Sequence, residues 1–394
     1  MSDRQRLLVP DLARGVSLGG IACANATTAW MTDANTAPGS TLGGVTHGST
    51  VDQVLAVLTA MFIHVRGLPM FSTLLGFGFG LVVSSLYRKR YPLPAARGIL
   101  ARRYAILAAF GFAHMFAVFY GDIMAMYGLI GVVLAMLFAV GSTWLRVIAY
   151  VPLTLFALTS AAGAAAAYFW GGFAAPELRS VTADLDSLPT YLGENLSAAV
   201  QMALASPFAV LELGGLTIIG YIWAREGYLV EVDKHRRILL AWAALAAAII
   251  LAVGLPWGLS AIGVLDPQLE EPLAMLNQGV GAFIGPGILA AFALLSHAIR
   301  DHSAWVYPFV ALGKRSMSGY LAQSFLFIIL VMPFGFGLGL EASISGKIAL
   351  GLLVWVITLV AASLLEAAGR QGPFEWAHRR LSYGPTGRIE PRDG

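Results

Sequence analysis

The chain has 394 residues, of which 58% are apolar and 12% are charged. Soluble domains are on average about 45–50% apolar and about 25% charged, so this composition excludes a disordered chain and nearly all soluble enzymes. A net charge of +3 on so apolar a chain does not indicate nucleic-acid binding, and the single Cys23 excludes an internal disulfide and a cysteine zinc site.

The chain is therefore predicted to be an all-α, polytopic helical bundle in a membrane, with no bound metal. A spanning helix needs about 20 mostly apolar residues, and stretches rich in Ala, Leu, Gly and Val form helices rather than barrel strands. About ten spans are predicted, at residues 14–32, 66–87, 101–119, 122–141, 143–170, 196–223, 237–260, 273–297, 316–334 and 346–367. The chain 1–394 is expected to be one transmembrane domain, with an external loop at 176–195 and a cytoplasmic tail at 371–394.

The apolar stretch from Asp52 to Tyr87 is longer than one span and is interrupted between His64 and Pro69. This pattern predicts a short amphipathic or re-entrant helix at 53–63, followed by a true span. Non-helical backbone at membrane depth is tolerated only where protein or a water-filled cavity surrounds it. The break is therefore a candidate lining for a site.

Orientation follows from the basic residues, because cytoplasmic loops of membrane proteins carry an excess of Lys and Arg. Nearly all of the 25 basic residues lie before the first predicted span, after the last one, or in alternate connections. The remaining connections are acidic. This pattern places both termini in the cytoplasm.

Polar groups within the predicted spans are costly, which makes them functional-site hypotheses. Glu212 falls near the middle of the sixth span, and Gln323 lies in the inner half of the ninth. Other polar residues fall toward the outer ends of the first four spans and are expected to meet in one external-facing cavity: Asn25, His64, Arg66, His114 and Asp122.

This set is suited to acyl transfer. A histidine can act as a general base or carry an acyl group, an aspartate can fix its tautomer, and an arginine can stabilise an oxyanion. The same residues would also serve a proton relay in a transporter. Simpler structural roles are open as well, because Asp122 can cap the fourth span, His114 can pack in the core, and His64 and Arg66 can lie at the headgroups.

Basic residues also gather at the cytoplasmic ends of several spans. They either anchor the helices or bind an anionic cytosolic cofactor such as an acyl-CoA, whose phosphates favour Arg and Lys. These residues are Arg14, Arg102, Arg103, Lys314 and Arg315. The glycines Gly76, Gly78 and Gly80 lie within an apolar span and predict close helix packing rather than a phosphate loop.

Several motifs give the chain a resemblance to a known family. They are Pro10 to Gly15 with Asn25, Leu68 to Gly78, His114 with Gly121-Asp122-Ile123 and Tyr127, Gly313 to Ser324, and Gly372 to Trp376 followed by Arg379 to Gly384. In these segments the chain resembles the YeiB-like family of bacterial membrane proteins, also called domain of unknown function 418. The motifs extend over the whole chain. The resemblance implies a multi-pass protein of the bacterial cytoplasmic membrane.

The YeiB-like family is grouped with transmembrane acyltransferases such as the lysosomal heparan-glucosaminide N-acetyltransferase. That enzyme is similar to this chain at Asp11, Arg14, Gly15, Asn25, Pro69, Phe71 and Gly76. The catalytic histidine of that enzyme lies in the external segment before its second span. Here His64 is the nearest counterpart in region, and His47 lies in the same segment.

The first hypothesis is therefore a membrane acyltransferase that moves an acyl group, expected to be acetyl, from cytosolic acyl-CoA to an envelope sugar or lipid. His114, His64, Asp122 and Arg66 would be catalytic, and the basic residues named above would bind acyl-CoA. Substrate contacts are assigned to Asn25, Glu212, Tyr127 and Gln323. Expected partners are membrane lipids, a small-molecule or glycolipid acceptor, and a second copy in a homodimer. The alternative, favoured by Glu212, is a transporter or lipid-handling protein with a proton relay.

Overall fold

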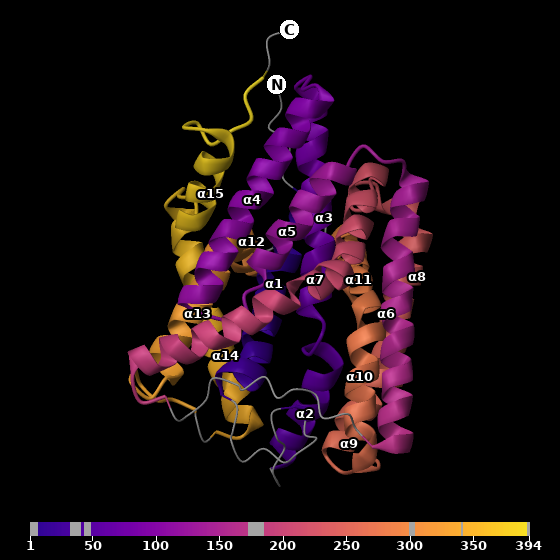
Figure 1. Ribbon diagram of the computed structural model, residues 1–394, viewed down its shortest axis with the longest axis vertical. Helices are drawn as coiled ribbons and strands as arrows, with labels where there is room; N and C mark the ends of the chain where they lie inside the picture. The colour runs from indigo at the N-terminus through magenta and orange to yellow at the C-terminus, as the bar shows by residue number, and fades with distance from the viewer. Residues whose placement is uncertain are drawn as a thin grey trace.

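The computed structural model describes residues 7–31, 41–42, 49–171, 185–298, 304–339 and 342–391. In these ranges the chain is a bundle of helices without strands (Figure 1). The α-helices are α1 Leu8–Asn25, α2 Thr50–Phe62, α3 Gly67–Arg88, α4 Leu93–Ala117, α5 Met124–Leu137, α6 Ser142–Trp170, α7 Leu188–Glu226, α8 Val232–Ile249, α9 Leu255–Ala261, α10 Glu270–Val280, α11 Ile284–Ala298, α12 Tyr307–Lys314, α13 Ser316–Val331, α14 Ile344–Ala367 and α15 Pro373–Tyr383. Short π and 3-10 segments are η1 Ala26–Trp30, η2 Ile250–Gly254, η3 Pro267–Leu269, η4 Gly281–Phe283 and η5 Ala304–Val306.

The prediction of a polytopic helical bundle is confirmed, and each predicted span falls on helix where it is described. By length and apolar character, six helical stretches are able to cross a membrane. They are Thr50–Arg88, Leu93–Ala117, Ser142–Trp170, Val232–Ala261, Pro267–Leu295 and Ile344–Ala367, and Met124–Leu137 and Ser316–Val331 are shorter apolar helices. The number of spans and the compartment of the termini remain predictions.

The range 176–195, predicted as an external loop, is helical in its last part. Helix α7 begins at Leu188 because Ser187 accepts a hydrogen bond from the Thr190 amide at 3.4 Å and Pro189 occupies the first turn. His47 and residues 176–184 lie outside the described residues. The predicted tail after residue 371 contains helix α15.

The predicted short helix before the second span is α2. Ser49 and Asp52 form a capping box at its start, and it ends at a turn over Ile63 to Arg66. Val65 in this turn has a φ of 56°, a left-handed conformation that is strained for a β-branched residue. Helix α3 then begins at Gly67, so the turn presents His64 between two helices.

Helices α3 and α7 approach closely at glycines. A Cβ added at Gly76 would overlap the Thr217 carbonyl of α7, and one at Gly220 would overlap the Thr73 carbonyl of α3. Small residues at such positions let two backbones meet within a membrane. The packing role predicted for Gly76 is therefore confirmed.

Replacing Gly220 with alanine is expected to lower the free energy of unfolding by about 1–3 kcal/mol, because the added methyl overpacks the α3–α7 contact. Gly193, in the same helix, has open space around it, so Gly193→Ala is expected to raise the free energy of unfolding by about 0.5–1 kcal/mol, because alanine has the higher helix propensity. Reversible unfolding in mixed micelles measures both. Equal effects of the two variants would contradict this packing.

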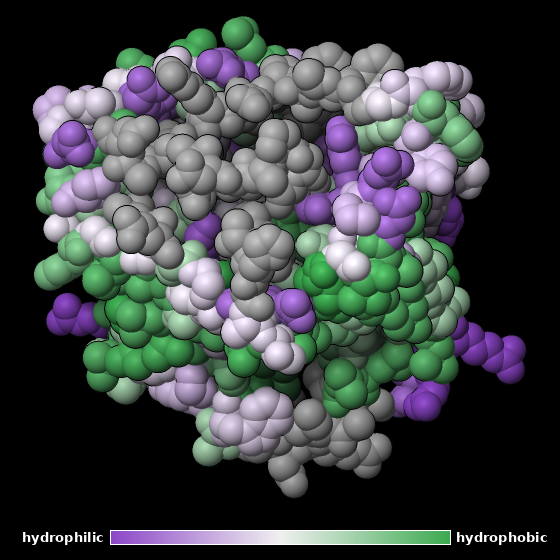
Figure 2. Space-filling model, turned by 90° about the horizontal axis from the view of Figure 1, so that it is seen from below, coloured by the Kyte–Doolittle hydropathy of each residue, from purple (hydrophilic) through white to green (hydrophobic). Residues whose placement is uncertain are grey.

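The two ends of the bundle differ. At one end, the start of α1 lies against the link between α12 and α13, since a Cβ at Gly313 would meet the Asp11 backbone, and α15 lies nearby (Figure 1). We call this the basic end. Helices α2 and α9 lie at the opposite end, where Figure 2 shows apolar and hydrophilic side chains side by side. The positive-inside pattern predicts that the basic end is cytoplasmic.

Candidate functional site

A cavity lies toward the α2 end of the bundle, between α1, the turn before α3 and α13. We call it the outer cavity. Its six polar lining residues come from five separate places in the sequence: Asn25 with Thr28, His64, Glu212, Gln278 and Tyr320. The structure thus brings together three of the predicted residues, Asn25, His64 and Glu212. The other three carry no charge, and of these only Tyr320 lies in one of the motifs, Gly313 to Ser324.

His64 is buried in the wall of this cavity, with 7% of its surface exposed. Its ring packs against the Trp257 ring, with a centroid separation of 5.7 Å. Its Nε2 atom has no hydrogen-bond partner among the described residues. Buried polar atoms are nearly always paired, so this unpaired nitrogen is unusual. It is itself covered, and the ring of a cavity-lining histidine would have to turn for the nitrogen to act on a bound molecule.

Arg66 is turned away from the outer cavity. Its guanidinium donates hydrogen bonds to the carbonyl oxygens of Met61 at 2.9 Å and Ala60 at 3.1 Å, and to Asn277 Oδ1 at 2.9 Å. The two carbonyls belong to the last turn of α2, whose C-terminal oxygens lack helical partners. Arg66 therefore closes the end of α2 and holds the turn that carries His64, and in this arrangement it does not face a reacting group.

His114 and Asp122 form a buried pair. His114 Nδ1 lies 2.7 Å from Asp122 Oδ2, and Asp122 Oδ1 accepts a hydrogen bond from the Ala125 amide at 2.8 Å. The carboxylate therefore both orients the imidazole and caps the start of α5. His114 Nε2 has no partner among the described residues, and the His114 ring packs on Tyr320 with a centroid separation of 5.6 Å.

The pair stands behind the outer cavity rather than in its lining. Gly121 and Ile123, the two neighbours of Asp122, line the cavity, as does Tyr320. The single external-facing cavity predicted for five residues is therefore lined by Asn25 and His64. His114 and Asp122 support its wall, and Arg66 supports its turn.

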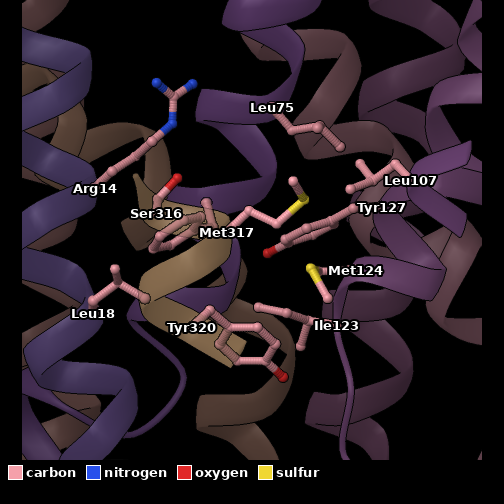
Figure 3. A pocket seen from close by; sticks show the side chains of 11 residues that line it. Arg14, Leu18, Leu75, Leu107, Ile123, Met124, Tyr127, Ser316, Met317 and Tyr320 are labelled. Carbon is pink, nitrogen blue, oxygen red and sulfur yellow. The ribbon is translucent and has the colours of Figure 1, made fainter. Parts of the chain in front are cut away.

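A second cavity, which we call the middle cavity, adjoins the outer one (Figure 3). Ile123 and Tyr320 line both. Its volume is about 130 Å³ against about 270 Å³ for the outer cavity, so it is the smaller of the two. Most of the side chains around it are apolar, and Arg14 extends from one edge of the group (Figure 3). Tyr127 also lines it, and the Tyr127 hydroxyl donates to the Leu68 carbonyl at 3.0 Å.

A third cavity, the basic cavity, continues from the middle one toward the basic end. The two share Arg14, Leu75, Leu107, Ser316 and Met317. The charged or titratable residues of its lining are Arg14, Arg103, Tyr104, Lys314, Glu375, His378 and Arg379. The outer, middle and basic cavities thus follow one another through shared walls.

The predicted cytoplasmic residues are divided among several places. Arg14, Arg103 and Lys314 line the basic cavity. Arg315 donates to Glu366 at 2.6 Å and lines a recess that shares Lys314, Glu375 and Arg379 with the basic cavity. Arg102 lines another recess, beside Tyr383. These recesses do not continue into the outer cavity.

Gln323 faces α1 instead of any of the three cavities. Its Nε2 donates to the Leu18 carbonyl at 3.3 Å, and its Oε1 has no partner within the described part of the chain. In the same part, no group of three or more His, Cys, Asp or Glu side chains is arranged to hold a metal ion.

Helix α15 covers the basic cavity and carries a buried histidine. His378 Nε2 donates to the Arg103 carbonyl at 3.0 Å, and the Arg103 guanidinium donates to the Tyr383 hydroxyl at 2.7 Å. Burial and the neighbouring Arg103 charge lower the pKa of His378 from 6.5 to about 4. The docked helix therefore holds His378 in its neutral form.

Acidification is expected to weaken the docking of α15. Because the pKa of His378 is lower in the folded protein than in the unfolded chain, the unfolded chain binds more protons between pH 6.5 and 4. The contribution of His378 to stability is complete above pH 6.5 and is lost as the pH falls toward 4. His378→Gln keeps an N–H donor and should flatten this part of the stability curve, measured by thermal unfolding between pH 7 and pH 4.5. An unchanged curve would refute the assignment.

Comparison with known proteins identifies relatives. Residues 223–385 match the family model described as "Protein of unknown function (DUF418)". Over 358 residues the chain is 25% identical to the uncharacterized protein YxaH of Bacillus subtilis (strain 168), and the alignment covers 85% of this chain and 83% of that protein. These matches confirm the resemblance predicted from the motifs.

Proposed function

We propose that this member of the DUF418 family is a membrane acyltransferase. It would move an acyl group, expected to be acetyl, from an acyl-CoA at the basic end to an envelope sugar or lipid at the opposite face of a bacterial cytoplasmic membrane. The observation that carries the proposal is the series of three cavities, which runs from Arg14, Arg103 and Lys314 to His64. A two-substrate reaction across a membrane needs its donor and acceptor sites to adjoin in this way.

The donor substrate would bind at the basic cavity. Arg and Lys side chains form charge-assisted hydrogen bonds to phosphates, so Arg14, Arg103 and Lys314 suit the phosphates of an acyl-CoA. The middle cavity is small and mostly apolar. It would accommodate the arm that carries the thioester rather than the nucleotide.

The acceptor would bind in the outer cavity, where amide, hydroxyl and carboxyl groups suit a polar headgroup. In the reaction, the acceptor oxygen or nitrogen forms a bond to the acyl carbon, and the carbon–sulfur bond of the thioester breaks. His64 Nε2 accepts the proton from the acceptor and returns it to the departing thiolate. Tyr320 lines both cavities. Its hydroxyl donates to the Gly121 carbonyl across 3.4 Å and also bonds to the Ile123 backbone, so it would donate to the oxyanion by exchanging its long bond to Gly121.

His114 and Asp122 would fix the wall at which the two substrates meet. The pair holds Gly121 and Ile123 through the start of α5 and holds Tyr320 through ring packing. It would therefore act on the reaction through Tyr320 and the backbone rather than by touching the acceptor.

Calorimetry of acetyl-CoA binding to the purified protein in detergent tests the donor site. Arg14→Gln combined with Lys314→Gln is expected to weaken binding at least about tenfold, since each residue contributes a charge to the basic cavity. The control is Arg146→Gln, because Arg146 is exposed and pairs with Glu226 at 2.6 Å. Failure of the folded wild-type protein to bind any acyl-CoA would refute the proposal.

A transporter or lipid-handling protein is the second candidate, and Glu212 favours it. A carboxyl group within a helix of a membrane bundle, at the wall of a cavity, is suited to bind a cation or relay a proton. Proteoliposomes would then show substrate or proton movement without acyl-CoA. Glu212→Gln would abolish that movement.

A further inference from the structure

The start of α13 already holds an anion supplied by α15. Glu375 Oε1 accepts hydrogen bonds from the amides of Met317 at 2.8 Å and Ser318 at 3.0 Å, and Glu375 Oε2 accepts one from the Ser318 hydroxyl at 2.5 Å. The Ser318 hydroxyl also accepts from the Phe374 amide at 3.1 Å. A helix N-terminus favours negative charge, so the Glu375 carboxylate occupies an anion-binding position at the start of α13.

Glu375 also belongs to the basic cavity. It is the one carboxylate in the described lining, which holds four basic side chains, Arg14, Arg103, Lys314 and Arg379. Glu375 and Arg379 are four residues apart on α15, so they lie on the same face of the helix. Lys314 also pairs with Glu366 at 2.5 Å, and Arg14 with Asp11 at 3.5 Å, so three carboxylates face these four basic side chains.

We propose that the basic cavity is a phosphate-binding site. In this structure Glu375 occupies the position of a ligand phosphate at the start of α13, and a ligand phosphate would compete with Glu375 for that position. Arg379 would contact the phosphate, a role that the sequence did not indicate. The inference deepens the proposed function, because the phosphate would be that of the acyl-CoA donor. When the phosphate displaces Glu375, the contact of α15 with α13 is lost, and α15, which covers the cavity, is held less firmly.

Removing the competing charge should strengthen binding. Glu375→Gln keeps an oxygen acceptor for the Met317 and Ser318 amides but removes the negative charge. Binding of inorganic pyrophosphate is expected to tighten about tenfold, because a neutral amide oxygen is a weaker acceptor than a carboxylate for the Met317 and Ser318 donors and is displaced more easily. Glu390→Gln, in the segment after α15 and outside the basic cavity, is the matched control and should leave pyrophosphate affinity unchanged.

Two neighbouring arginines of α15 provide a second test of the site, in which a basic residue is removed instead of the competing carboxylate. Arg379 lines the basic cavity, whereas the Arg380 guanidinium lies over the Trp376 ring at 4.6 Å. Arg379→Gln is expected to weaken pyrophosphate binding about tenfold, while Arg380→Gln should have no effect. Thermal unfolding of each variant without ligand reports whether its fold is intact.

The probes distinguish the source of the phosphate. The measurement uses the full chain in nanodiscs and titrates pyrophosphate and coenzyme A, with and without phosphatidylglycerol in the bilayer. If the inference and the proposed function are both correct, Glu375→Gln tightens both ligands and coenzyme A binds more strongly than pyrophosphate. If pyrophosphate responds to Glu375→Gln but coenzyme A has no advantage, or phosphatidylglycerol blocks the site, the phosphate site stands and the acyl-CoA assignment fails. If neither ligand responds to Glu375→Gln or Arg379→Gln, the inference is overturned.

Discussion

Replacing His64 with glutamine is expected to lower acyl transfer by about 10²–10⁴-fold while leaving acetyl-CoA affinity unchanged. His64 is the histidine in the outer-cavity lining, and its Nε2 has no partner among the described residues. Glutamine is similar in size but cannot accept a proton at neutral pH. The measurement is the rate of transfer from labelled acetyl-CoA, made alongside calorimetry on the same preparation.

The matched control for this variant is His235→Gln. His235 stacks on Tyr228 at a centroid separation of 4.4 Å and lines none of the three cavities. Its replacement should leave transfer unchanged. A His64→Gln protein with full transfer would remove His64 from the proposed reaction.

Disruption of the His114–Asp122 pair is expected to have the largest effect on stability. Asp122→Ala should lower the free energy of unfolding by about 3–5 kcal/mol, because it leaves a buried partner and the start of α5 unsatisfied. Asp122→Asn keeps an oxygen for the Ala125 amide and should cost less. Asparagine would, however, offer an N–H to His114 Nδ1 and shift the ring to its other tautomer.

A double-mutant cycle with His114→Phe and Asp122→Asn measures the pair directly. Unfolding in mixed micelles should give a coupling energy of about 1–3 kcal/mol, in the range for residues in one buried network. Acyl transfer by Asp122→Asn is the second readout. If the two changes add without coupling, the 2.7 Å contact does not contribute to stability as described.

The helical architecture could be read from the sequence because membrane burial imposes a simple pattern. Long apolar stretches correspond to α3, α4, α6 and α14, and the interruption at His64 corresponds to the turn after α2. The glycine spacing around Gly76 identified a helix contact correctly. These features depend on local composition, which a single sequence contains.

The direction of individual side chains was not contained in that pattern. Arg66 has the chemistry of an oxyanion-binding residue, but carbonyls of α2 and Asn277, more than 200 positions away, take its guanidinium. Tyr320 carries no charge, and the motif from Gly313 to Ser324 that contains it did not indicate that it lines two cavities. Such roles arise only when distant helices pack together.

At the basic end, too, the sequence did not predict which side chains meet. Charge counts identified Arg102 and Arg315 as readily as Arg14 and Lys314, yet only the last two line the basic cavity. Glu375 lies in a short polar helix, and its contact with α13 depends on how α15 folds back after α14. Sequence reasoning found the charges but not their partners.

The most direct test of the acyltransferase proposal is transfer across native membranes. Inside-out vesicles from cells that produce the protein would receive acetyl-CoA labelled in the acetyl group, and the label in the washed membrane fraction would be followed over time. The proposal predicts label in a sugar or lipid product with the wild-type protein and a loss of about 10²–10⁴-fold with His64→Gln. Wild-type vesicles that contain folded protein but incorporate no more label than vesicles without it would contradict the proposal.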